Sequence, residues 1–262
     1  DHIELGPVVL SAGLRHDWAE NRTLAISGPD IVSDQEATTG RLGLMYRFDN
    51  GVSPYVSYSE AFTMNLGTDG TAEANALDPT TGDQQEAGIK YLSPDQSLAI
   101  SAAYFDITQQ NRVSDGVTPG GVEQTGAVVD GWELQVNKRW QNFETQLAYT
   151  HMNATDDTTG ERLSAVAEEQ ASWWNRLYVG DHWRLGAGVR YVGDNVGFGG
   201  SPVVPSSTLY DAMVGYTIDE WDFSLDVKNL TDDETISWCR YEGGDCGYGA
   251  RRNVTANVRY QF

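Results

Sequence analysis

Strict alternation of apolar and polar residues over the last ten positions constrains the fold of this chain more than any other feature. Val254, Ala256, Val258, Tyr260 and Phe262 fall on one face of the stretch, and polar residues fill the positions between them. A period of two predicts a β-strand, because successive side chains of a strand point to opposite faces. A strand that is apolar on one side invites pairing at the edge of a soluble sheet. It suits instead a closed barrel in the bacterial outer membrane, with lipid outside and water inside.

The same alternation recurs along the whole chain and predicts an all-β, antiparallel, transmembrane β-barrel with about twelve strands. Short turns near residues 50, 94, 141, 181 and 219 alternate with much longer polar loops, which is the periplasmic and extracellular pattern of outer-membrane barrels. Two of those long loops are expected at about 19–37 and 111–127. The expected strands are about Val8–Trp18, Thr38–Phe48, Val52–Phe62, Gly82–Leu92, Ser97–Gln110, Val128–Trp140, Phe143–Asn153, Glu168–Val179, Trp183–Asp194, Thr208–Thr217, Trp221–Ile236 and Asn253–Phe262.

Composition agrees with a membrane location without a transmembrane helix. The mean hydropathy is −0.44, and no run of about 18 apolar residues is present. A barrel strand exposes only every second residue to lipid, so its mean hydropathy stays low. Eight Trp, thirteen Tyr and seven Phe fit aromatic girdles at the two membrane interfaces, although aromatic residues also fill ordinary cores. The net charge of −21 argues against nucleic acid as a partner, since phosphate backbones are bound by Lys and Arg.

The two cysteines indicate an oxidising compartment. Cys239 and Cys246 lie in one loop with six residues between them, and an even count at short spacing suits a disulfide. Metal binding by this pair is not expected, because a zinc site usually takes four ligands and no neighbouring Cys or His supplies the others.

Several motifs resemble TonB-dependent siderophore receptors, especially the ferrichrome type. At the carboxy-terminal end these are an Asn-Leu-Thr-Asp turn, the paired-Cys loop, a Tyr-Gly-Ala-Arg-Arg segment and the terminal aromatic strand. Their order and spacing, together with further segments upstream, extend the resemblance over nearly the whole chain. The upstream segments are Val9–Asp17, Tyr55–Phe62, Gly82–Tyr91, Ala103–Asn111 and Gly186–Gly193.

The resemblance implies an outer-membrane receptor that imports ferric siderophores. Such receptors have 22 strands and a plug in the lumen, so residues 1–262 are expected to form the last twelve strands, with the plug and the first strands absent. The implied partners are a ferric siderophore, outer-membrane lipid and the TonB complex, which acts through the plug; no resident cofactor is expected. Without the driven parts, this chain by itself is not expected to perform energised uptake. The missing parts would belong to a longer chain, of which this is a fragment, or to a separate chain. The alternative is a self-contained twelve-strand pore that conducts passively.

The paired-Cys loop is the best candidate site. The resemblance implies that it lies at the extracellular mouth, where Trp238, Tyr241 and Tyr248 would approach the ligand. Arg240 follows the first Cys, where the ferrichrome type tends to have an aromatic residue, and a guanidinium there would attract an anionic chelate. A bridge that only stiffens a surface loop is the alternative interpretation.

Two phenylalanines, a set of charged residues and one histidine complete the candidates. Phe62 and Phe198 are expected near the extracellular ends of strands, as mouth or girdle residues. Inward-facing Arg, Lys, Asp and Glu side chains are expected to line the lumen and meet a plug or water. His151 is the residue around which an outer-membrane hydrolase site would form, but no nucleophile motif accompanies it, so the protein is not expected to be an enzyme.

Overall fold

A computed structural model describes residues 1–24, 30–69, 75–115, 122–197, 200–240 and 244–262. Nearly all of this chain is antiparallel β-structure, and one 13-stranded sheet holds most of it. The strands of that sheet are β1 (His2–Leu5), β2 (Val8–Thr23), β3 (Ile31–Tyr46), β4 (Val52–Thr63), β5 (Thr80–Leu92), β6 (Leu98–Asp115), β7 (Val122–Arg139), β8 (Phe143–Asp156), β9 (Glu169–Val179), β10 (Trp183–Val192), β13 (Ser207–Ile218), β14 (Trp221–Lys228) and β17 (Asn253–Tyr260).

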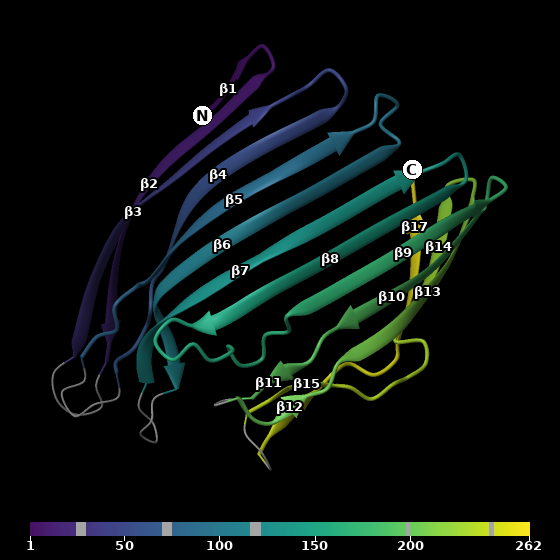
Figure 1. Ribbon diagram of the computed structural model, residues 1–262. Helices are drawn as coiled ribbons and strands as arrows, with labels where there is room; N and C mark the ends of the chain where they lie inside the picture. The colour runs from purple at the N-terminus through teal and green to yellow at the C-terminus, as the bar shows by residue number, and fades with distance from the viewer. Residues whose placement is uncertain (25–29, 70–74, 116–121, 198–199, 241–243) are drawn as a thin grey trace.

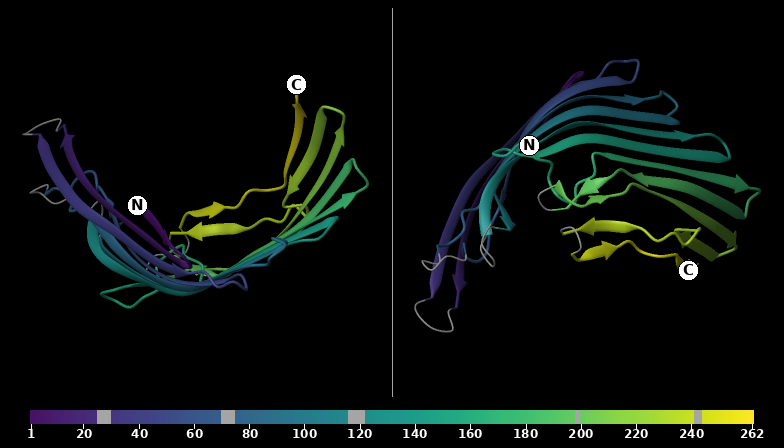
Figure 2. Two further views of the ribbon diagram at one scale, coloured as in Figure 1. Left: turned by 90° about the horizontal axis from the view of Figure 1, so that it is seen from above. Right: turned by 60° about the horizontal axis from the view of Figure 1, so that its bottom comes forward.

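The sheet follows the chain, since each strand pairs with the next one of the sheet in sequence order. It bends into a deep trough, with β1 and β17 as its two edges (Figures 1 and 2). Two small hairpins lie outside it: β11 (Asn195–Val196) with β12 (Val203–Val204), and β15 (Ile236–Cys239) with β16 (Cys246–Tyr248). No helix in the described residues is long and apolar enough to span a membrane.

All twelve expected strands are present, and β1 is a thirteenth. The expected strand from Trp221 to Ile236 is wrong beyond Lys228, where the sheet strand ends. Asn229 and Asp232 have φ angles of 53° and 59°, a left-handed conformation that an extended strand does not adopt. The chain therefore leaves the sheet after β14 and returns to it only at β17.

The register separates an apolar face from a polar face. On the apolar face Phe223 lies opposite both Tyr216 and Val258, and on the polar face Asp222 lies opposite Arg259. Glycines on the polar face make room for large neighbours: a Cβ on Gly186 would lie only 2.5 Å from Cζ2 of Trp174. Such crowding is expected where side chains converge, so we assign the polar face to the concave side of the trough and the apolar face to the convex side.

One aromatic girdle of the convex face follows the short turns. There the ring centroids of Trp183 and Tyr216 are 4.6 Å apart, and those of Trp221 and Tyr260 are 4.8 Å apart. Tryptophan and tyrosine are enriched at membrane interfaces because one end of each ring system is apolar and the other is wet. This row therefore marks one boundary of the apolar band.

A second girdle lies towards the long loops, where the rings of Trp132 and Tyr149 are 5.0 Å apart. Trp140 directly follows the last residue of the same strand, at the short-turn end, and its ring centroid is 5.4 Å from that of Phe143. The stretch from Trp132 to Trp140 has nine residues. A tilted strand needs roughly 9–11 residues to cross the hydrocarbon core, so the two girdles are spaced as the two interfaces of a membrane.

The loop end of the sheet differs from expectation in its strand lengths. β2 and β3 each have 16 residues and β6 and β7 each have 18, so only residues 24–30 and 116–121 are left to connect them. The long loops expected at 19–37 and 111–127 are therefore wrong in extent. The ladders continue past the apolar band, where both faces of a strand are wet and the apolar alternation that marks a strand in the sequence is lost.

Candidate ligand-binding mouth

The paired cysteines form a disulfide within a small hairpin, which we call the disulfide hairpin (residues 236–240 and 244–248). Cys239 lies opposite Cys246 in the ladder between β15 and β16, and the two are bonded. The backbone N–H of Arg240 donates to the carbonyl oxygen of Asp245 at 3.0 Å, and the two charged side chains lie 3.8 Å apart. The hairpin folds from one wall towards the inside of the trough (Figure 2). The expected disulfide is thus present and holds a loop on the concave side.

A small buried cluster supports this hairpin. Val196, Val204 and Cys239 are buried, and the side-chain amide of Asn195 donates to the carbonyl oxygen of Ser237 at 3.2 Å. The carbonyl oxygen of Val196 in turn accepts from the N–H of Ala165 at 2.8 Å. Contacts between three connections at the loop end therefore hold the hairpin in one place. These connections are 157–168, 193–206 and 229–252.

Three of the predicted mouth residues share the disulfide hairpin: Trp238, Arg240 and Tyr248. The side chain of Trp238 is 39% exposed and that of Tyr248 is 68% exposed, so both offer aromatic surface. Trp238 lies against Gly247, where a Cβ would be 2.2 Å from its Nε1 atom, so this close approach requires glycine. Ligand contact by these side chains remains a prediction. Two other predicted residues lie outside the described part of the chain: Tyr241 and Phe198.

Phe62 is not brought together with the disulfide hairpin. It lies on β4 opposite Thr81. Glu60 precedes it by two residues and Tyr58 by four. Residues of the same parity share one face of a strand, so Phe62 lies on the apolar, convex face with Tyr58 and Val56. That placement suits a girdle residue better than a residue of the mouth.

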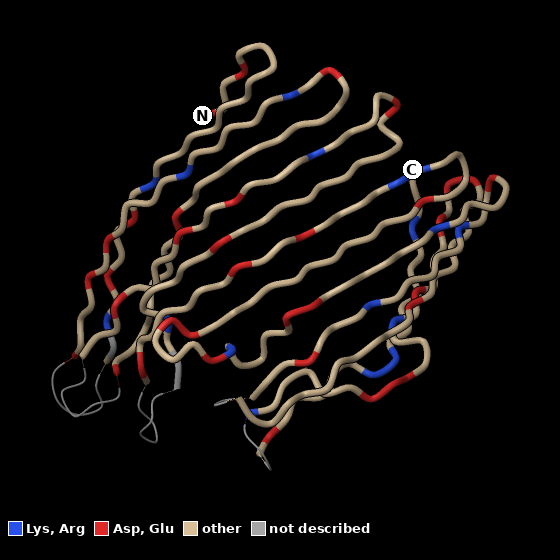
Figure 3. Tube along the Cα trace, viewed as in Figure 1, with Lys and Arg blue, Asp and Glu red and all other residues tan. Residues whose placement is uncertain are grey.

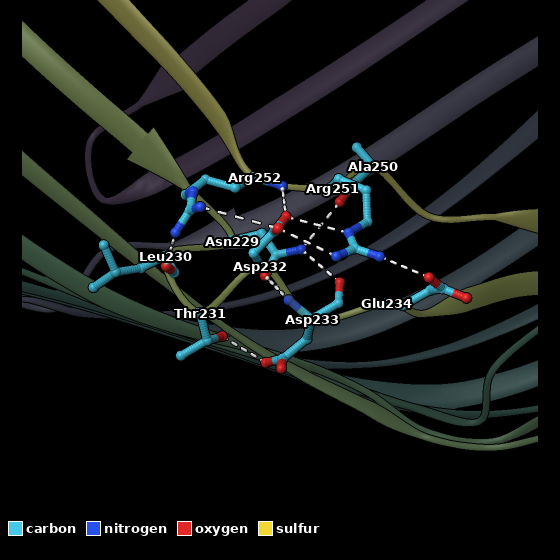
Figure 4. A network of polar contacts seen from close by, with 9 residues as sticks. All are labelled: Asn229, Leu230, Thr231, Asp232, Asp233, Glu234, Ala250, Arg251 and Arg252. Carbon is cyan, nitrogen blue, oxygen red and sulfur yellow. Dashed lines mark hydrogen bonds and ion pairs between the residues drawn. The ribbon is translucent and has the colours of Figure 1, made fainter.

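A polar network at the base of the hairpin is a feature that the sequence reasoning missed. The Arg251 guanidinium donates to Asp232 from Nε and Nη2, each at 3.2 Å, and to Glu234 from Nη1 at 2.6 Å. The N–H of Arg252 also donates to Asp232, at 2.9 Å. Acidic residues before the hairpin and two arginines after it were the signal in the sequence. This loop-base network joins the two segments that flank the hairpin, 229–234 and 250–252 (Figure 4).

Asn229 is the buried centre of the loop-base network. It is 1% exposed, its Nδ2 donates to the carbonyl oxygens of Asp233 and Ala250, and its Oδ1 accepts from the N–H of Asp233. Its own N–H donates to Oδ1 of Asp211 at 2.9 Å, and that carboxylate also accepts from Arg190. One asparagine therefore connects the end of β14, the return to β17 and the concave wall.

Acid should release the loop-base network only well below neutral pH. Hydrogen bonds from Arg251, followed by the N–H of Arg252, lower the pKa of Asp232 from 3.8 to about 2. Because the folded pKa is the lower one, the contribution of Asp232 to stability is complete above about pH 4 and is lost as the pH falls through about 2. We expect the Nε–H resonance of Arg251 to follow this lower midpoint in an NMR titration. A midpoint near the ordinary value of 3.8 would contradict the pairing.

The concave wall carries charged side chains that neutralise one another. Nη2 of Arg184 lies 2.6 Å from Oδ2 of Asp222, and Nε of Arg190 lies 2.6 Å from Oδ2 of Asp211. Both pairs join neighbouring parts of the wall rather than pointing freely into the lumen. Part of the mixed lining expected from the sequence is thus held in cross-strand ion pairs. A further set of the same kind consists of Arg139, Glu144 and Arg176.

His151 lies on the other face of the sheet. Its ring centroid is 6.3 Å from that of Trp132, and its Nδ1 is 3.9 Å from a carboxylate oxygen of Glu169. Since His151 pairs with Trp132 in the ladder between β7 and β8, it belongs to the convex girdle. Within the described residues the contacts of its ring are therefore with an aromatic residue and a carboxylate of the same face.

The apolar convex face, the two girdles and the separation of short turns from long loops define a wall of an outer-membrane β-barrel. The chain belongs to the TonB-dependent receptor-like β-barrel family, whose family model matches residues 1–230. The disulfide hairpin lies beyond the matched residues. In this class of barrel the loop end is extracellular and the short turns are periplasmic.

Curated relatives match almost the whole chain. It is 33% identical over 259 residues to the ferrioxamine receptor of Yersinia enterocolitica, covering 93% of this chain and 36% of that protein. It is 32% identical over 284 residues to the ferrichrome outer membrane transporter/phage receptor of Escherichia coli K12, covering 100% of this chain and 37% of that protein. The chain therefore spans little more than a third of the length of these relatives. Both relatives are receptors or transporters.

Solved structures agree on the fold. The siderophore receptor PiuA from Acinetobacter baumannii superposes with a TM-score of 0.80 at 24% identity, over 99% of this chain and 42% of that one. The copper transporter OprC superposes with a TM-score of 0.81 at 16% identity, over 99% of this chain and 46% of that one. The trough is thus the shape that this length of chain takes in larger barrels.

Proposed function

We propose that this chain forms the carboxy-terminal part of the barrel of a TonB-dependent receptor for ferric siderophores. The observation that carries the proposal is the disulfide hairpin, which the loop-base network holds on the concave side at the extracellular end. The functions of the two relatives above, a ferrioxamine receptor and a ferrichrome transporter, support a ferric chelate of one of these kinds as the ligand. Trp238 and Tyr248 would offer aromatic surface to that chelate, and Arg240 would offer charge.

The open edges of the sheet support further strands in the working barrel. β1 and β17 are the two ends of the strand order, and an unpaired edge is not tolerated in lipid because its N–H and C=O groups lack partners. We propose that additional strands close the barrel and that a plug fills its lumen. Ligand capture at the mouth would then be followed by plug displacement, driven by the TonB complex. Because the charged side chains of the concave wall pair with one another, they would form a rigid surface along which such a plug moves.

Titration of the purified receptor tests the ligand assignment. Ferric ferrioxamine B and ferrichrome should each be compared with their metal-free forms, using tryptophan fluorescence to follow binding. We expect at least one ferric form to bind saturably, with a weaker response to its metal-free form. Absence of saturable binding by both ferric chelates would contradict a receptor for chelates of this kind.

Removing the disulfide should weaken ligand binding while leaving the barrel stable. In the chain-entropy model a loop this short contributes about 2–3 kcal/mol of local ordering, and β14 and β17 already pair below it. We therefore expect Cys239→Ser combined with Cys246→Ser to lower chelate affinity about tenfold, which corresponds to about 1.4 kcal/mol. The thermal melt of the barrel should change little. Unchanged affinity would show that the disulfide has no part in ligand binding.

A further inference from the structure

The ladder between β3 and β4 is much shorter than the two strands that form it. It has five residue pairs, from Arg41 opposite Ser59 to Met45 opposite Tyr55. On its other side β3 pairs with β2 over its full length, from Tyr46 to Ile31. Towards the loop end, β2 and β3 leave the neighbouring strands (Figure 1). The loop-end half of β3, from Val32 to Thr38, therefore has no strand paired on its β4 side within the described residues, and we call it the free edge. In the same part of the chain, the β4–β5 connection is tied to it only through a side chain, since Nε2 of Gln35 donates to the carbonyl oxygens of Asn65 and Leu77.

The backbone groups on this edge can be identified from the ladder. The N–H of Phe48 donates to Val52 on the β4 side, and the N–H of Gly40 donates to the carboxylate of Glu60 at 2.7 Å. Successive residues of a strand direct their backbone groups to opposite neighbours, so even-numbered residues of β3 face β4. On the β4 side, the backbone groups of the next four even-numbered residues make no backbone hydrogen bond to another described residue. The four are Val32, Asp34, Glu36 and Thr38.

Acidic side chains surround this free edge. Asp34 and Glu36 are exposed, and neither has an ion pair with a described residue. Asp34 lies directly opposite Glu20, and Glu60 lies directly opposite Asp83 on the far side of the gap. Like charges in opposite positions destabilise a sheet, so a cationic partner would be favoured here.

The loop-end halves of β2 and β3 show the same imbalance of charge as a whole. Acidic positions outnumber basic ones along this part of the sheet (Figure 3). Arg22 is the one basic side chain on the same face of β2 beyond Glu20 within the described residues. The free edge therefore combines unused backbone donors and acceptors with an excess of negative charge.

We propose that the free edge of β3 binds an extended, lysine- or arginine-rich peptide segment of an extracellular protein by antiparallel strand addition. An added strand pairs its backbone with the edge and takes its selectivity from alternate side chains. The edge from Val32 to Thr38 is about 20 Å long at 3.3 Å per residue, which suits a strand of about seven residues. The acidic pairs supply the charge complementarity. This inference does not depend on the proposed uptake of ferric siderophores.

The geometry of an antiparallel ladder decides which backbone groups of the peptide are used. A peptide residue directly opposite Asp34 or Glu36 shares their face of the sheet and directs its own N–H towards β3. Lysines placed there for charge pairing therefore also donate the backbone hydrogen bonds. The residues between them direct their N–H groups away from β3.

Fluorescence anisotropy with the whole receptor in detergent micelles tests the proposal. The probe is a labelled decapeptide of alternating lysine and threonine. Two further peptides of the same sequence carry backbone N-methyl groups, one on every lysine and the other on every threonine, so charge is unchanged. We expect methylation of the lysines to weaken binding at least tenfold relative to methylation of the threonines. Equal affinity of the two methylated peptides, or no binding of the unmodified probe, would overturn strand addition.

Two protein variants separate backbone pairing from charge. Glu36→Pro removes an N–H from the free edge while the β2 ladder keeps its donors on Gln35 and Ala37, and Pro is tolerated at strand edges. Glu36→Gln removes only the charge. We expect the proline variant to lose clearly more affinity for the unmodified peptide than the glutamine variant. Equal effects of the two variants would contradict pairing through the backbone.

Discussion

Replacing Asn229 by alanine is expected to lower the local free energy of unfolding of the disulfide hairpin by about 4–5 kcal/mol. The side chain makes three hydrogen bonds, to Asp233 twice and to Ala250 once, each worth about 1 kcal/mol. The φ angle of 53° adds a cost of about 1–2 kcal/mol for a residue with a Cβ that cannot bond locally. Hydrogen exchange of the Asp233 amide should accelerate about a thousandfold, since about 1.4 kcal/mol is a factor of ten.

Two further variants identify the source of that loss. Asn229→Gly accepts the positive φ angle and should lose only the hydrogen-bond part of the effect. Leu230→Ala changes a neighbouring side chain that is exposed, and should have little effect. If Asn229→Ala and Leu230→Ala accelerated exchange equally, Asn229 would not be the centre of the loop-base network.

Replacing Leu225 by arginine is expected to destabilise the barrel by about 2–4 kcal/mol, the range for a charge near the bilayer midplane. Leu225 is 42% exposed on the convex face, opposite Val214 and Ala256. It lies four residues, or about 13 Å along the strand, from the girdle residue Trp221. Urea titration of the receptor folded into lipid vesicles measures the difference.

Ser224→Arg is the matched control for that charge. Ser224 is the preceding residue and lies on the concave face, where its hydroxyl donates to Asp226 at 3.0 Å. An arginine there would meet the carboxylates of Asp222 and Asp226 in a polar lumen, so we expect a change within about 1 kcal/mol, as for exposed ion pairs. A larger loss for Ser224→Arg than for Leu225→Arg would reverse the assignment of the two faces.

The sequence predicted the membrane-spanning strands because lipid on one side and water on the other impose a period of two on them. That signal ends where the strands leave the bilayer, which is why the loop-end parts of β2, β3, β6 and β7 were expected as loops. The same alternation is enough to assign Phe62 to the apolar face, because Phe62 is separated from Val56 and Tyr58 by an even number of residues. The disulfide followed from the number and spacing of the cysteines.

The loop-base network had only a charge pattern as its signal, acidic residues before the hairpin and two arginines after it, with no period to show which of them meet. Its contacts join residues 229–234 to residues 250–252 across the disulfide hairpin, and polar contacts between separated segments follow no period. Asn229 resembles an ordinary turn residue until the structure shows it to be buried. The Asn-Leu-Thr-Asp and Tyr-Gly-Ala-Arg-Arg motifs that carried the family resemblance contain Asn229 and Asp232 from one side of this network and Ala250, Arg251 and Arg252 from the other.

Uptake of iron by intact cells tests the central claim most directly. The complete gene that contains this coding sequence should be expressed as the sole receptor, and transport of radioactive iron supplied as ferrioxamine B or ferrichrome should be measured with and without TonB. We predict saturable uptake of at least one chelate that disappears when TonB is removed. Uptake that is unsaturable and unchanged without TonB would contradict a driven receptor and would indicate a passive pore.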